Sequence, residues 1–461
     1  MSRNFYDLFG LVAGICFILA LKGLSSPKSA RRGNLIGALG ATVATVIVFF
    51  YANDGKALNN QSLILAAIGF GVVVGVPAAR KVQMTQMPQL VALFNGVGGG
   101  AAALVAIVEY FKLGSDATTA VVVATVFTVI VGCISFSGSI ITFLKLQELM
   151  TTRPVIFPFG RQIIALTLIG VLASGGWVIS SGGTTPLLIN GLLSLLFGVL
   201  FVLPVGGADV PIVISLLNAF TGLTVAASGY VLETTLLIVA GTLVGASGTI
   251  LTRLMAEAMG RSLFGTLFGA FTAKASSATG LADTRPVKSG SADDVAILLN
   301  YAQRVVIVPG FGLAVAQAQH TVRELADLLA AKSVEVAYGI HPVAGRMPGH
   351  MNVLLAEANV PYEQLVEMEE INPTFPQTDV VLVVGANDVV NPAAKTTPGC
   401  PIYGMPILDV ALAANVIFLK RSMRPGFAGI ENELLYEPKT TLLFGDAKDS
   451  LTKVVSALKA L

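Results

Sequence analysis

Nine apolar stretches, each about the 20 residues that a bilayer requires, fill the first 260 residues of the chain. We expect membrane-spanning helices near residues 6–23, 34–51, 62–79, 90–110, 120–145, 162–180, 186–204, 210–229 and 235–254. Of all 461 residues, 54% are hydrophobic and only 12% are charged, which leaves too little polar surface for a soluble protein. The pattern therefore predicts a polytopic α-helical membrane domain over residues 1–260, in which the first stretch is retained rather than cleaved as a signal peptide.

Basic residues gather in alternate connections between these stretches. They follow the first, third, fifth and ninth stretches: Lys22, Lys28, Arg31, Arg32, Arg80, Lys81, Lys145, Arg153, Arg161, Arg253 and Arg261. The opposite connections carry little more than Arg3, Lys56 and Lys112. By the positive-inside rule, the N-terminus lies outside and the C-terminal part lies in the cytoplasm. We expect a multi-pass protein of the inner (plasma) membrane.

The apolar pattern ends before a second, soluble part of the chain. Residues 261–290 are rich in Ser, Ala, Gly and Thr, which indicates a linker or hinge. Residues 291–461 alternate between strand-like and helix-like periods. We expect strands at 304–308, 334–339, 365–368, 380–385, 416–420 and 441–444, and helices at 314–331, 350–358 and from about 447. This order predicts a Rossmann-like α/β domain with a parallel sheet covered on both faces.

The strongest local motif follows the first predicted strand and reads GFGLAV, from Gly310 to Val315. Gly310 allows a tight turn, Gly312 lets the backbone approach a pyrophosphate, and the following helix offers free N–H groups. A glycine pair alone is weak support for a nucleotide, but its position between a strand and an Ala-rich helix strengthens it. An NAD site would place an acidic residue at the end of the second strand. Glu335 lies too early on that strand and His341 follows its end, so NAD is disfavoured.

A basic cluster, Lys420-Arg421-Ser422, ends another apolar strand and offers an ammonium, a planar guanidinium and a hydroxyl together. These groups suit the 2′-phosphate of NADP, although a solvated basic strand end is the ordinary alternative. The neighbouring segment 424–429 is typical of a mobile flap, and Gly385 to Asp388 follow a further strand. Arg346 is a candidate for a phosphate contact, and a surface salt bridge explains it equally well.

Few polar residues interrupt the membrane half. Asp209, between the seventh and eighth stretches, either caps the next helix or takes part in transport, and one residue can do both. Asn95 and Asn218 lie amid apolar neighbours, where interhelical adhesion is favoured over a role in holding a water chain. The three cysteines are scattered and predict neither a disulfide framework nor a metal site. No histidine precedes His320, which excludes a haem-based transmembrane electron carrier.

Long motifs resemble one known family. Gly310 to Gln319 (GFGLAVAQAQ), Gly339 to Ala356 (GIHPVAGRMPGHMNVLLA), 385–388 with 391–394, 420–423, 445–447, 206–211 and 84–93 closely resemble the β subunit of proton-translocating nicotinamide nucleotide transhydrogenase. The resemblance covers nearly the whole chain. It implies an NADP(H)-binding domain attached to the membrane domain. The nucleotide would be bound in a flipped orientation relative to ordinary Rossmann domains.

The resemblance also implies a set of residues that contact NADP(H). These are Gly310, Phe311, Gly312, Leu313, Ala314, Val315, Val343, Ala344, Gly345, Arg346, Met347, Pro348, Gly385, Ala386, Asn387, Asp388, Val389, Gly404, Met405, Lys420, Arg421, Ser422, Gly426, Phe427, Asp446 and Ala447. Residues 420–422 would hold the 2′-phosphate, 310–315 and 343–348 the pyrophosphate, and 385–389 the nicotinamide side. NAD(H) would lie on a separate α subunit that carries further transmembrane helices, in a dimer of αβ units. Hydride would pass directly between the two nicotinamides, driven toward NADPH by inward proton flow.

The chain departs from the family pattern at two positions. Many relatives have a membrane histidine where this chain has Asn95, and a tyrosine where it has Phe427. Asn95 cannot titrate, which leaves Asp209, waters or a companion subunit to carry the proton. We expect Asp209, Asn218 and Asn95 to mark the proton path. The rival interpretation is a transporter or channel gated by an NADPH-sensing domain, which predicts internal repeats that the sequence does not show.

Overall fold

The computed structural model describes residues 3–50, 60–114, 117–151, 154–206, 209–259, 285–346, 349–398, 400, 402–426 and 428–461. The chain divides into two compact units, one of Met1–Val205 with Ile212–Thr252 and one of Gly206–Pro211 with Arg253–Leu461. Most of the expected linker at 261–290 lies outside the described residues.

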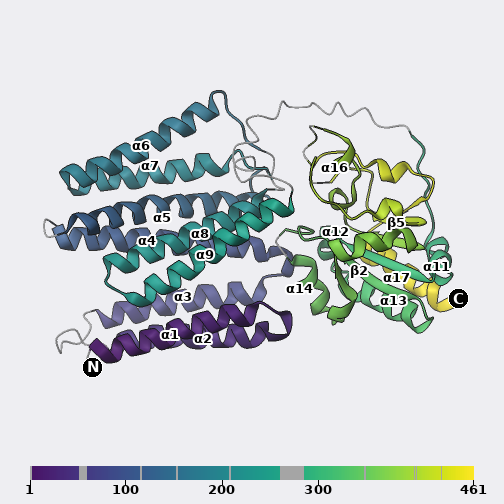
Figure 1. The fold of residues 1–461 in the computed structure, drawn as a ribbon, viewed down its shortest axis with the longest axis horizontal. Coiled ribbons are helices and arrows are strands. Elements are labelled where there is room, and N and C mark those ends of the chain that lie inside the picture. The colour runs from purple at the N-terminus through teal and green to yellow at the C-terminus, as the bar shows by residue number, and fades with distance from the viewer. Residues whose placement is uncertain are drawn as a thin grey trace. The chain divides into compact units, whose positions relative to one another are not determined.

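Nine helices long and apolar enough to cross a membrane are present among the residues that the structure describes. They are α1 (Arg3–Leu24), α2 (Pro27–Phe50), α3 (Gln61–Lys81), α4 (Met87–Leu113), α5 (Thr119–Leu146), α6 (Gly160–Ser181), α7 (Thr184–Val202), α8 (Val210–Val231) and α9 (Thr235–Ala258), with the short η1 (Met84–Gln86) before α4. Figure 1 shows the nine lying alongside one another. Every predicted span coincides with one of them to within a few residues, so that prediction is confirmed. Helices suit a bilayer because each satisfies its own backbone polar groups.

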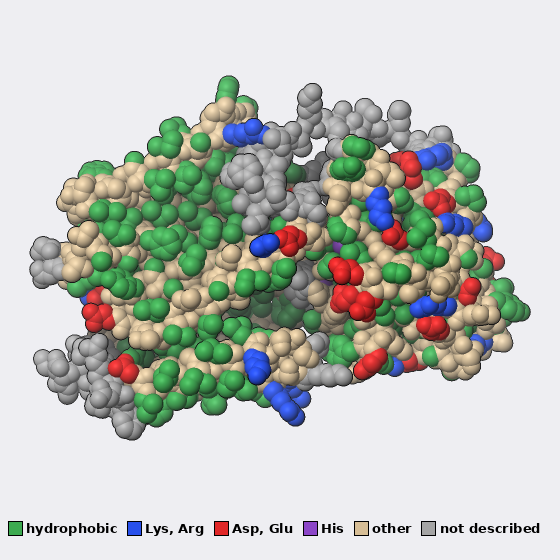
Figure 2. Space-filling view, in the orientation of Figure 1, with side chains coloured by type: hydrophobic (Ala, Val, Ile, Leu, Met, Phe, Trp, Pro, Cys, Tyr) green, Lys and Arg blue, Asp and Glu red, His purple; other side chains and the backbone are tan. Residues whose placement is uncertain are grey.

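The outer surface of this bundle is apolar. Figure 2 shows hydrophobic side chains over the visible face of the helices, whereas the charged side chains in this view lie mostly on the C-terminal domain. On α3 no described residue is buried, and side chains as large as Phe70 and Val73 are more than 70% exposed. Such a surface is stable against lipid or another apolar surface rather than against water.

Inside the bundle, small residues let the helices approach closely. A Cβ on Gly248 of α9 would lie 2.9 Å from the backbone nitrogen of Ala219 on α8. On α4, a Cβ on Gly96 would lie 3.0 Å from Ser139 Cβ, and one on Gly99 would lie 3.1 Å from Ser135 Cβ. The glycines of the fourth and ninth spans therefore serve close helix packing, as their spacing predicts.

Lys145 differs from the expectation that it belongs to the solvated basic loops. Its side chain is fully buried at the end of α5. The ammonium donates to the carbonyl oxygens of Val202, Leu203 and Val205, at 3.2, 2.6 and 2.7 Å. These carbonyls follow the last turns of α7 and lack partners within that helix, so all three ammonium protons find acceptors.

The C-terminal domain contains a six-stranded parallel sheet in the order β3-β2-β1-β4-β5-β6. The strands are β1 (Arg304–Pro309), β2 (Glu335–Ile340), β3 (Leu365–Glu367), β4 (Val380–Val384), β5 (Asn415–Lys420) and β6 (Thr440–Phe444). All six match the predicted strands, and the parallel sheet is confirmed. The order reverses between β1 and β4, and a ligand site is expected at that point in an open sheet of this kind.

Both faces of the sheet are covered. On one face pack α11 (Ala292–Asn300), α13 (Gln319–Ala331) and α17 (Ala447–Ala460). The other face forms a buried core of Val306, Val308, Val381, Val383, Val416, Phe418 and Leu442 with side chains from the connecting segments. Those segments contain α14 (His350–Glu357), α15 (Met368–Ile371), α16 (Ala393–Thr396), η4 (Tyr362–Gln364), η5 (Asn372–Gln377), η6 (Asp388–Val390), η7 (Val410–Leu412) and η8 (Glu433–Tyr436).

The single helix predicted at 314–331 is wrong. The structure has a short α12 (Phe311–Val315) and then α13, separated by a turn in which Gln317 has a φ of 52°. The N–H of Ala318 closes this turn on the carbonyl of Leu313 at 3.2 Å. Alanine and glutamine favour helix throughout this segment, so propensity alone gives no sign of the break.

Candidate nucleotide site

Two glycine turns meet where the strand order reverses. The N–H of Gly310 donates to the carbonyl of Val384 at 2.9 Å, and the N–H of Gly312 donates to that of Gly385 at 2.9 Å. A Cβ on Gly310 would lie 2.5 Å from Ala386 Cα, and one on Gly312 would lie 2.6 Å from Gly385 Cα. Gly385 itself has a φ of 70°. The turns after β1 and β4 can be this close only because these positions lack side chains.

A cavity of about 290 Å³ opens beside these turns. Its walls come from the ends of β4, β5 and β6 and from the start of α17. They are formed by Gly312, Gly385, Ala386, Asn387, Leu419, Lys420, Arg421, Ser422, Arg424, Pro425, Gly426, Gly445 and Ala447. The structure therefore brings together nine of the residues predicted from the sequence, although they come from four separate segments.

Positive charge dominates the polar part of this wall. Lys420 is half-buried, and its ammonium donates to Asn387 Oδ1 at 3.1 Å and to the Arg424 carbonyl at 3.4 Å. Burial lowers the pKa of Lys420, and the nearby Asp388 opposes that change. Arg421 is exposed, with its Nε 3.9 Å from Asp446 Oδ2. Lys420, Arg421 and Arg424 give the cavity the charge that a phosphate group requires.

The flap at 424–428 is tied to the turn after β4. The N–H of Ala428 donates to Asp388 Oδ2 at 2.9 Å, and Asn387 Nδ2 donates to Asp388 Oδ1 at 3.0 Å. A Cβ on Gly426 would overlap the Asp388 carboxylate, so a side chain at this position would have to displace that carboxylate. Phe427 lies outside the described residues.

A second cationic group stands at the turn after β2. The Arg346 guanidinium lies over the Phe311 ring, 4.4 Å from its centroid. The N–H of Arg346 donates to His350 Nδ1 at 3.1 Å, and the His350 side chain is fully buried. Burial and the neighbouring Arg346 lower the pKa of His350. Arg346 therefore stacks on the motif after β1. Gly345, with a φ of 107°, adjoins this pair, and Met347 and Pro348 lie outside the described residues.

His341 joins two loops that the sequence assigns to the nucleotide. Its Nδ1 accepts the N–H of Val343 at 3.2 Å, so Nε2 carries the proton and donates to the Pro406 carbonyl at 2.8 Å. The side chain is buried, and burial lowers the pKa of His341 to about 4. His341 is therefore neutral at physiological pH.

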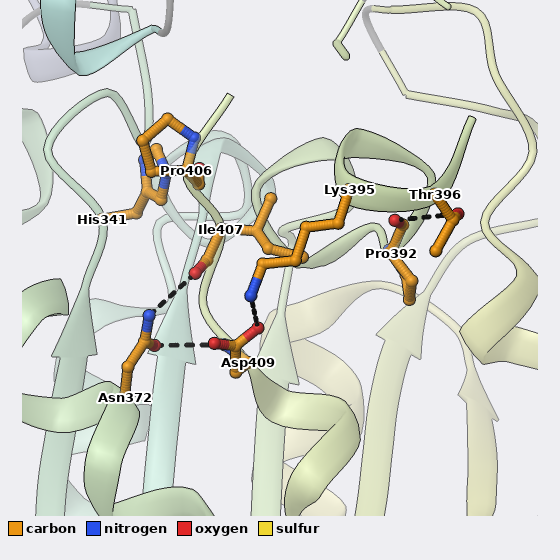
Figure 3. A network of polar contacts seen from close by, with 8 residues as sticks. All are labelled: His341, Asn372, Pro392, Lys395, Thr396, Pro406, Ile407 and Asp409. Atoms are coloured by element: carbon orange, nitrogen blue, oxygen red, sulfur yellow. Dashed lines mark hydrogen bonds and ion pairs between the residues drawn. The ribbon is translucent and has the colours of Figure 1, made fainter. Parts of the chain in front are cut away.

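Residues 404–409 form a strap that is held from several sides (Figure 3). Asn372 donates to the Ile407 carbonyl at 3.0 Å and accepts the N–H of Asp409 at 3.1 Å. Lys395 pairs with the Asp409 carboxylate. Gly404 has a φ of 83°, and its N–H donates to the Ala394 carbonyl at 2.9 Å. The strap is thus fixed to elements that follow β2, β3 and β4.

Several other predicted residues have buried side chains and can offer only backbone to a ligand. The side chains of Leu313, Ala314 and Ala344 are buried, and that of Met405 packs in a small core with Ile402 and Ile407. Val389 and Val343 are partly buried against core clusters, and Val315 is exposed on α12.

In the membrane half, Asn95 joins α4 to α5. Its Nδ2 donates to Ser139 Oγ at 3.0 Å and to Ser135 Oγ at 3.3 Å. Ser135 in turn lies 2.6 Å from Thr221 Oγ1 on α8. Asn95 Oδ1 is buried and has no hydrogen-bond partner among the residues that the structure describes. The Nδ2 group of Asn95 therefore holds α4 against α5, in agreement with interhelical adhesion. The Oδ1 atom can still accept a hydrogen bond.

The other two predicted membrane residues lie elsewhere on α8. Asp209 is buried and directly precedes the helix, with Pro211 in the first turn, as a capping position requires. Asn218 is half-buried in the second turn after that.

Comparison with known proteins decides the family. A sequence model of the NAD(P) transhydrogenase beta subunit matches residues 6–457. The chain belongs to this family. Two relatives from Rhodospirillum rubrum, one of them assigned to a particular strain, are each 47% identical over 457 residues. The match covers 97% of this chain and 98% of each relative, and both are called NAD(P) transhydrogenase subunit beta.

The resemblance stated from the motifs is confirmed, and the chain is a subunit of an NAD(P) transhydrogenase that binds a nicotinamide nucleotide. Within this transhydrogenase fold, sequence reasoning missed some residues of the cavity. Arg424, Pro425, Leu419 and Gly445 line it although the motifs did not single them out as ligands. Arg424 could have been found as a third basic residue close to Lys420. Asn372 carried no signal, because its partners lie 35 and 37 residues away.

Proposed function

We propose that this chain is the β subunit of a proton-translocating transhydrogenase and that it binds NADP(H), whereas NAD(H) is bound by an α subunit. In this proposal residues 1–260 form the transmembrane domain, 261–290 a hinge and 291–461 the NADP(H)-binding domain. Hydride passes between the two nucleotides, and the transfer is coupled to proton movement across the membrane.

One observation favours NADP(H) over NAD(H) as the nucleotide of this chain. Lys420, Arg421 and Arg424 line a single cavity together with the Ser422 hydroxyl. Three cations and a hydroxyl fit a terminal phosphate monoester such as the 2′-phosphate, which NAD lacks. The position after β2 supports the same choice, because the buried imidazole of His341 stands where an NAD site would place a carboxylate.

The remaining residues suit the rest of a dinucleotide. Turns 310–312 and 385–387 present backbone without side chains, and Arg346 adds a cation stacked on Phe311. Bound nicotinamide rings supply the hydride chemistry themselves. The chain's residues bind and orient, and Asp388 holds the flap, so we assign no protein acid or base to the hydride step.

We also propose a partner and a location for this chain. The relatives are named subunit beta, which supports an α partner for this chain. We propose that the α subunit carries further transmembrane helices, that the complex is a dimer of αβ units, and that it lies in the inner (plasma) membrane. The N-terminus is outside and the C-terminal domain is cytoplasmic, consistent with the distribution of basic residues.

For the proton, we propose a path marked by Asp209, Asn218 and Asn95. Asn95 holds hydrogen bonds but cannot titrate, so Asp209 or water carries the charge. Proton binding near Asp209 would change how α8 and α9 present the hinge, and the nucleotide-binding domain would alternate between occluding and exchanging NADP(H). Coupling of this kind needs an element whose two states are biased by both sites.

Binding to the full αβ complex tests the choice of nucleotide. We expect Lys420→Ala and Arg421→Ala each to weaken NADP⁺ at least about tenfold, because charge-assisted hydrogen bonds contribute about 1.5–3 kcal/mol. NAD⁺ binding should change far less. The exposed Lys332→Ala on the same domain is the matched control and should change neither. Equal loss of both nucleotides would contradict a 2′-phosphate role.

Vesicles that contain the full complex test the coupling. We expect the lumenal pH to change during hydride transfer from NADPH to an NAD⁺ analogue, and an imposed pH gradient to alter the rate. Hydride transfer without any pH change would leave a transhydrogenase that does not pump. Nucleotide-dependent transport without hydride transfer would support the rival, a transporter gated by NADPH.

A further inference from the structure

Helices α5 and α8 face each other through hydroxyl-bearing side chains. Ser135 Oγ on α5 lies 2.6 Å from Thr221 Oγ1 on α8. Three residues earlier on α5, a Cβ on Gly132 would lie 3.1 Å from Thr224 Cγ2, three residues later on α8. This is the register of antiparallel helices. Continued by one turn, it places Thr128 opposite Ser228.

Most members of this row are shielded from solvent, and Thr221 is partly buried. Thr125, Thr128, Ser135 and Thr224 have no exposed surface, Ser139 is 1% exposed and Ser228 is 4% exposed. We call Ser139, Ser135, Thr221, Thr224, Thr128, Ser228 and Thr125 the hydroxyl ladder. Along α5 it extends over 14 residues, or about 21 Å, which is most of a hydrocarbon core of about 30 Å.

Both ends of the ladder carry a buried polar atom that has no hydrogen-bond partner in the described part of the chain. At one end this is Asn95 Oδ1, beside Ser139 and Ser135, and at the other it is Thr125 Oγ1. Thr128 and Thr224 each donate to a carbonyl on their own helix at 2.8 Å, but Thr125 has no such bond. Simple interhelical adhesion would pair these atoms. Buried polar atoms that lack protein partners commonly bind water.

The spacing of the ladder also suits water. Successive positions are three or four residues apart along a helix, a rise of about 5 Å. One water molecule with two hydrogen bonds of about 2.8 Å covers that distance. Each hydroxyl can donate and accept, so a chain of hydroxyls and waters can pass a proton in either direction.

The ladder is narrowest at Gly132. A Cβ there would lie 2.7 Å from the Gly99 carbonyl oxygen and 3.0 Å from Ala103 Cβ, so α4, α5 and α8 are in close contact at mid-height. A route that is closed at its middle cannot leak. Coupled transport requires such a barrier, because a continuous path would dissipate the gradient.

We propose that the hydroxyl ladder holds water molecules on either side of its closed point at Gly132 and forms the half of the proton route that leads from Asn95 to the beginning of α5. In an up-and-down bundle that end is opposite to the one at which α9 leads toward the C-terminal domain. The proposal rests on the proton translocation proposed above. Its ligand is water or hydronium, since no side chain of the ladder titrates near neutral pH.

Silver-ion labelling of the full αβ complex tests for these water molecules directly. Thr128→Cys and Ser228→Cys are introduced singly, with Cys16 and Cys400 replaced by alanine. The native Cys133 stays as an internal control, because it is buried on another face of α5, with Sγ 3.9 Å from a Cβ on Gly191 of α7. We expect the new cysteines to react with Ag⁺ at least about tenfold faster than Cys133. Reaction at the rate of Cys133 would overturn the proposal.

Transport by a double variant provides the second test. Thr128→Val with Ser228→Ala removes two hydroxyls at nearly constant volume. The control Ser194→Ala removes a buried hydroxyl that donates to Asn190 O on its own helix at 2.7 Å. We expect the double variant to translocate protons at least about tenfold more slowly, with single-turnover hydride exchange unchanged and the control at the wild-type rate.

The two proposals fail in different ways. If wild-type vesicles move no protons, the proposed coupling is wrong, and the labelling experiment still decides whether water occupies the ladder. If the wild type pumps and the double variant pumps equally fast, the ladder is not the route although the coupling holds.

Discussion

The carboxylate of Asp388 accepts the backbone N–H of Ala428 at 2.9 Å and so ties the flap to the turn after β4. We expect Asp388→Ala to release the flap and to weaken NADP⁺ binding by about 1–3 kcal/mol, since the N–H loses its acceptor. The dissociation rate, measured by stopped flow on the full complex, should rise correspondingly. Asp388→Asn keeps an acceptor oxygen and should lose less; a loss as large as that of alanine would argue against the hydrogen bond.

Arg346 and Phe311 form a second pair. The contribution of their stacking to NADP⁺ binding can be measured separately from that of the Arg346 charge. Arg346→Lys keeps the cation but loses the planar group that lies 4.4 Å from the ring centroid. We expect it to weaken NADP⁺ binding, and Phe311→Leu to weaken it by about 0.5–1 kcal/mol. In a double-mutant cycle by calorimetry the two effects should not add. Full additivity would show that the stacking contributes nothing.

The buried His341 makes the C-terminal domain sensitive to acid. Its pKa is about 4 when folded, against about 6.5 in an unfolded chain, so the unfolded state binds more protons between these values. The contribution to stability is complete above about pH 6.5 and is lost as the pH falls toward 4, by about 3 kcal/mol in all.

Scanning calorimetry of the full chain in detergent measures this effect. We expect the melting temperature of the C-terminal domain to fall between pH 6.5 and 4.5, and His341→Gln to flatten that fall. The exposed His320→Gln serves as the control and should leave the profile unchanged. An unchanged profile for His341→Gln would assign the acid sensitivity to another group.

The glycine turns leave no room for side chains. Gly312→Ala would bring a Cβ to 2.6 Å from Gly385 Cα, so we expect about 1–3 kcal/mol of destabilisation and a larger loss of NADP⁺ affinity. The control Gly339→Ala places its Cβ no closer than 3.4 Å to any atom. In thermal unfolding and in nucleotide-binding measurements, Gly312→Ala should be impaired and Gly339→Ala should not.

Lys145 stabilises the end of α7 through three carbonyls. Lys145→Met has similar length and no donor. The Val202 and Leu203 carbonyls still accept backbone N–H groups, so we expect destabilisation of the membrane domain by about 1–3 kcal/mol, chiefly from the lost bond to the buried Val205 carbonyl. Protease resistance and melting temperature in detergent should fall. Lys112→Met, at an exposed salt bridge, should change neither.

Periodicity was sufficient to predict the nine membrane helices and the six strands described in this fold. Long apolar runs can be satisfied only by helices in a bilayer, and short valine-rich runs such as 380–384 fit buried parallel strands. The break at Gln317 escaped prediction because it depends on a backbone turn within a sequence that favours helix.

The candidate site was partly predictable for a similar reason. Gly310 and Gly385 follow strands and Lys420 is the last residue of one, and parallel strands carry such residues to one edge of the sheet. The partners of His341, Asn372 and Lys145 are backbone carbonyls more than 30 residues away, and no residue type marks them in advance. The tight fit of Gly312 against Gly385 likewise became visible only in three dimensions.

The turns after β1 and β4 share two backbone hydrogen bonds and exclude every side chain from the space between them. Neither can shift without displacing the other, so they behave as one mechanical piece. A displacement of the turn at Asp388 would therefore be transmitted directly to the turn at Phe311, without a change in any other element.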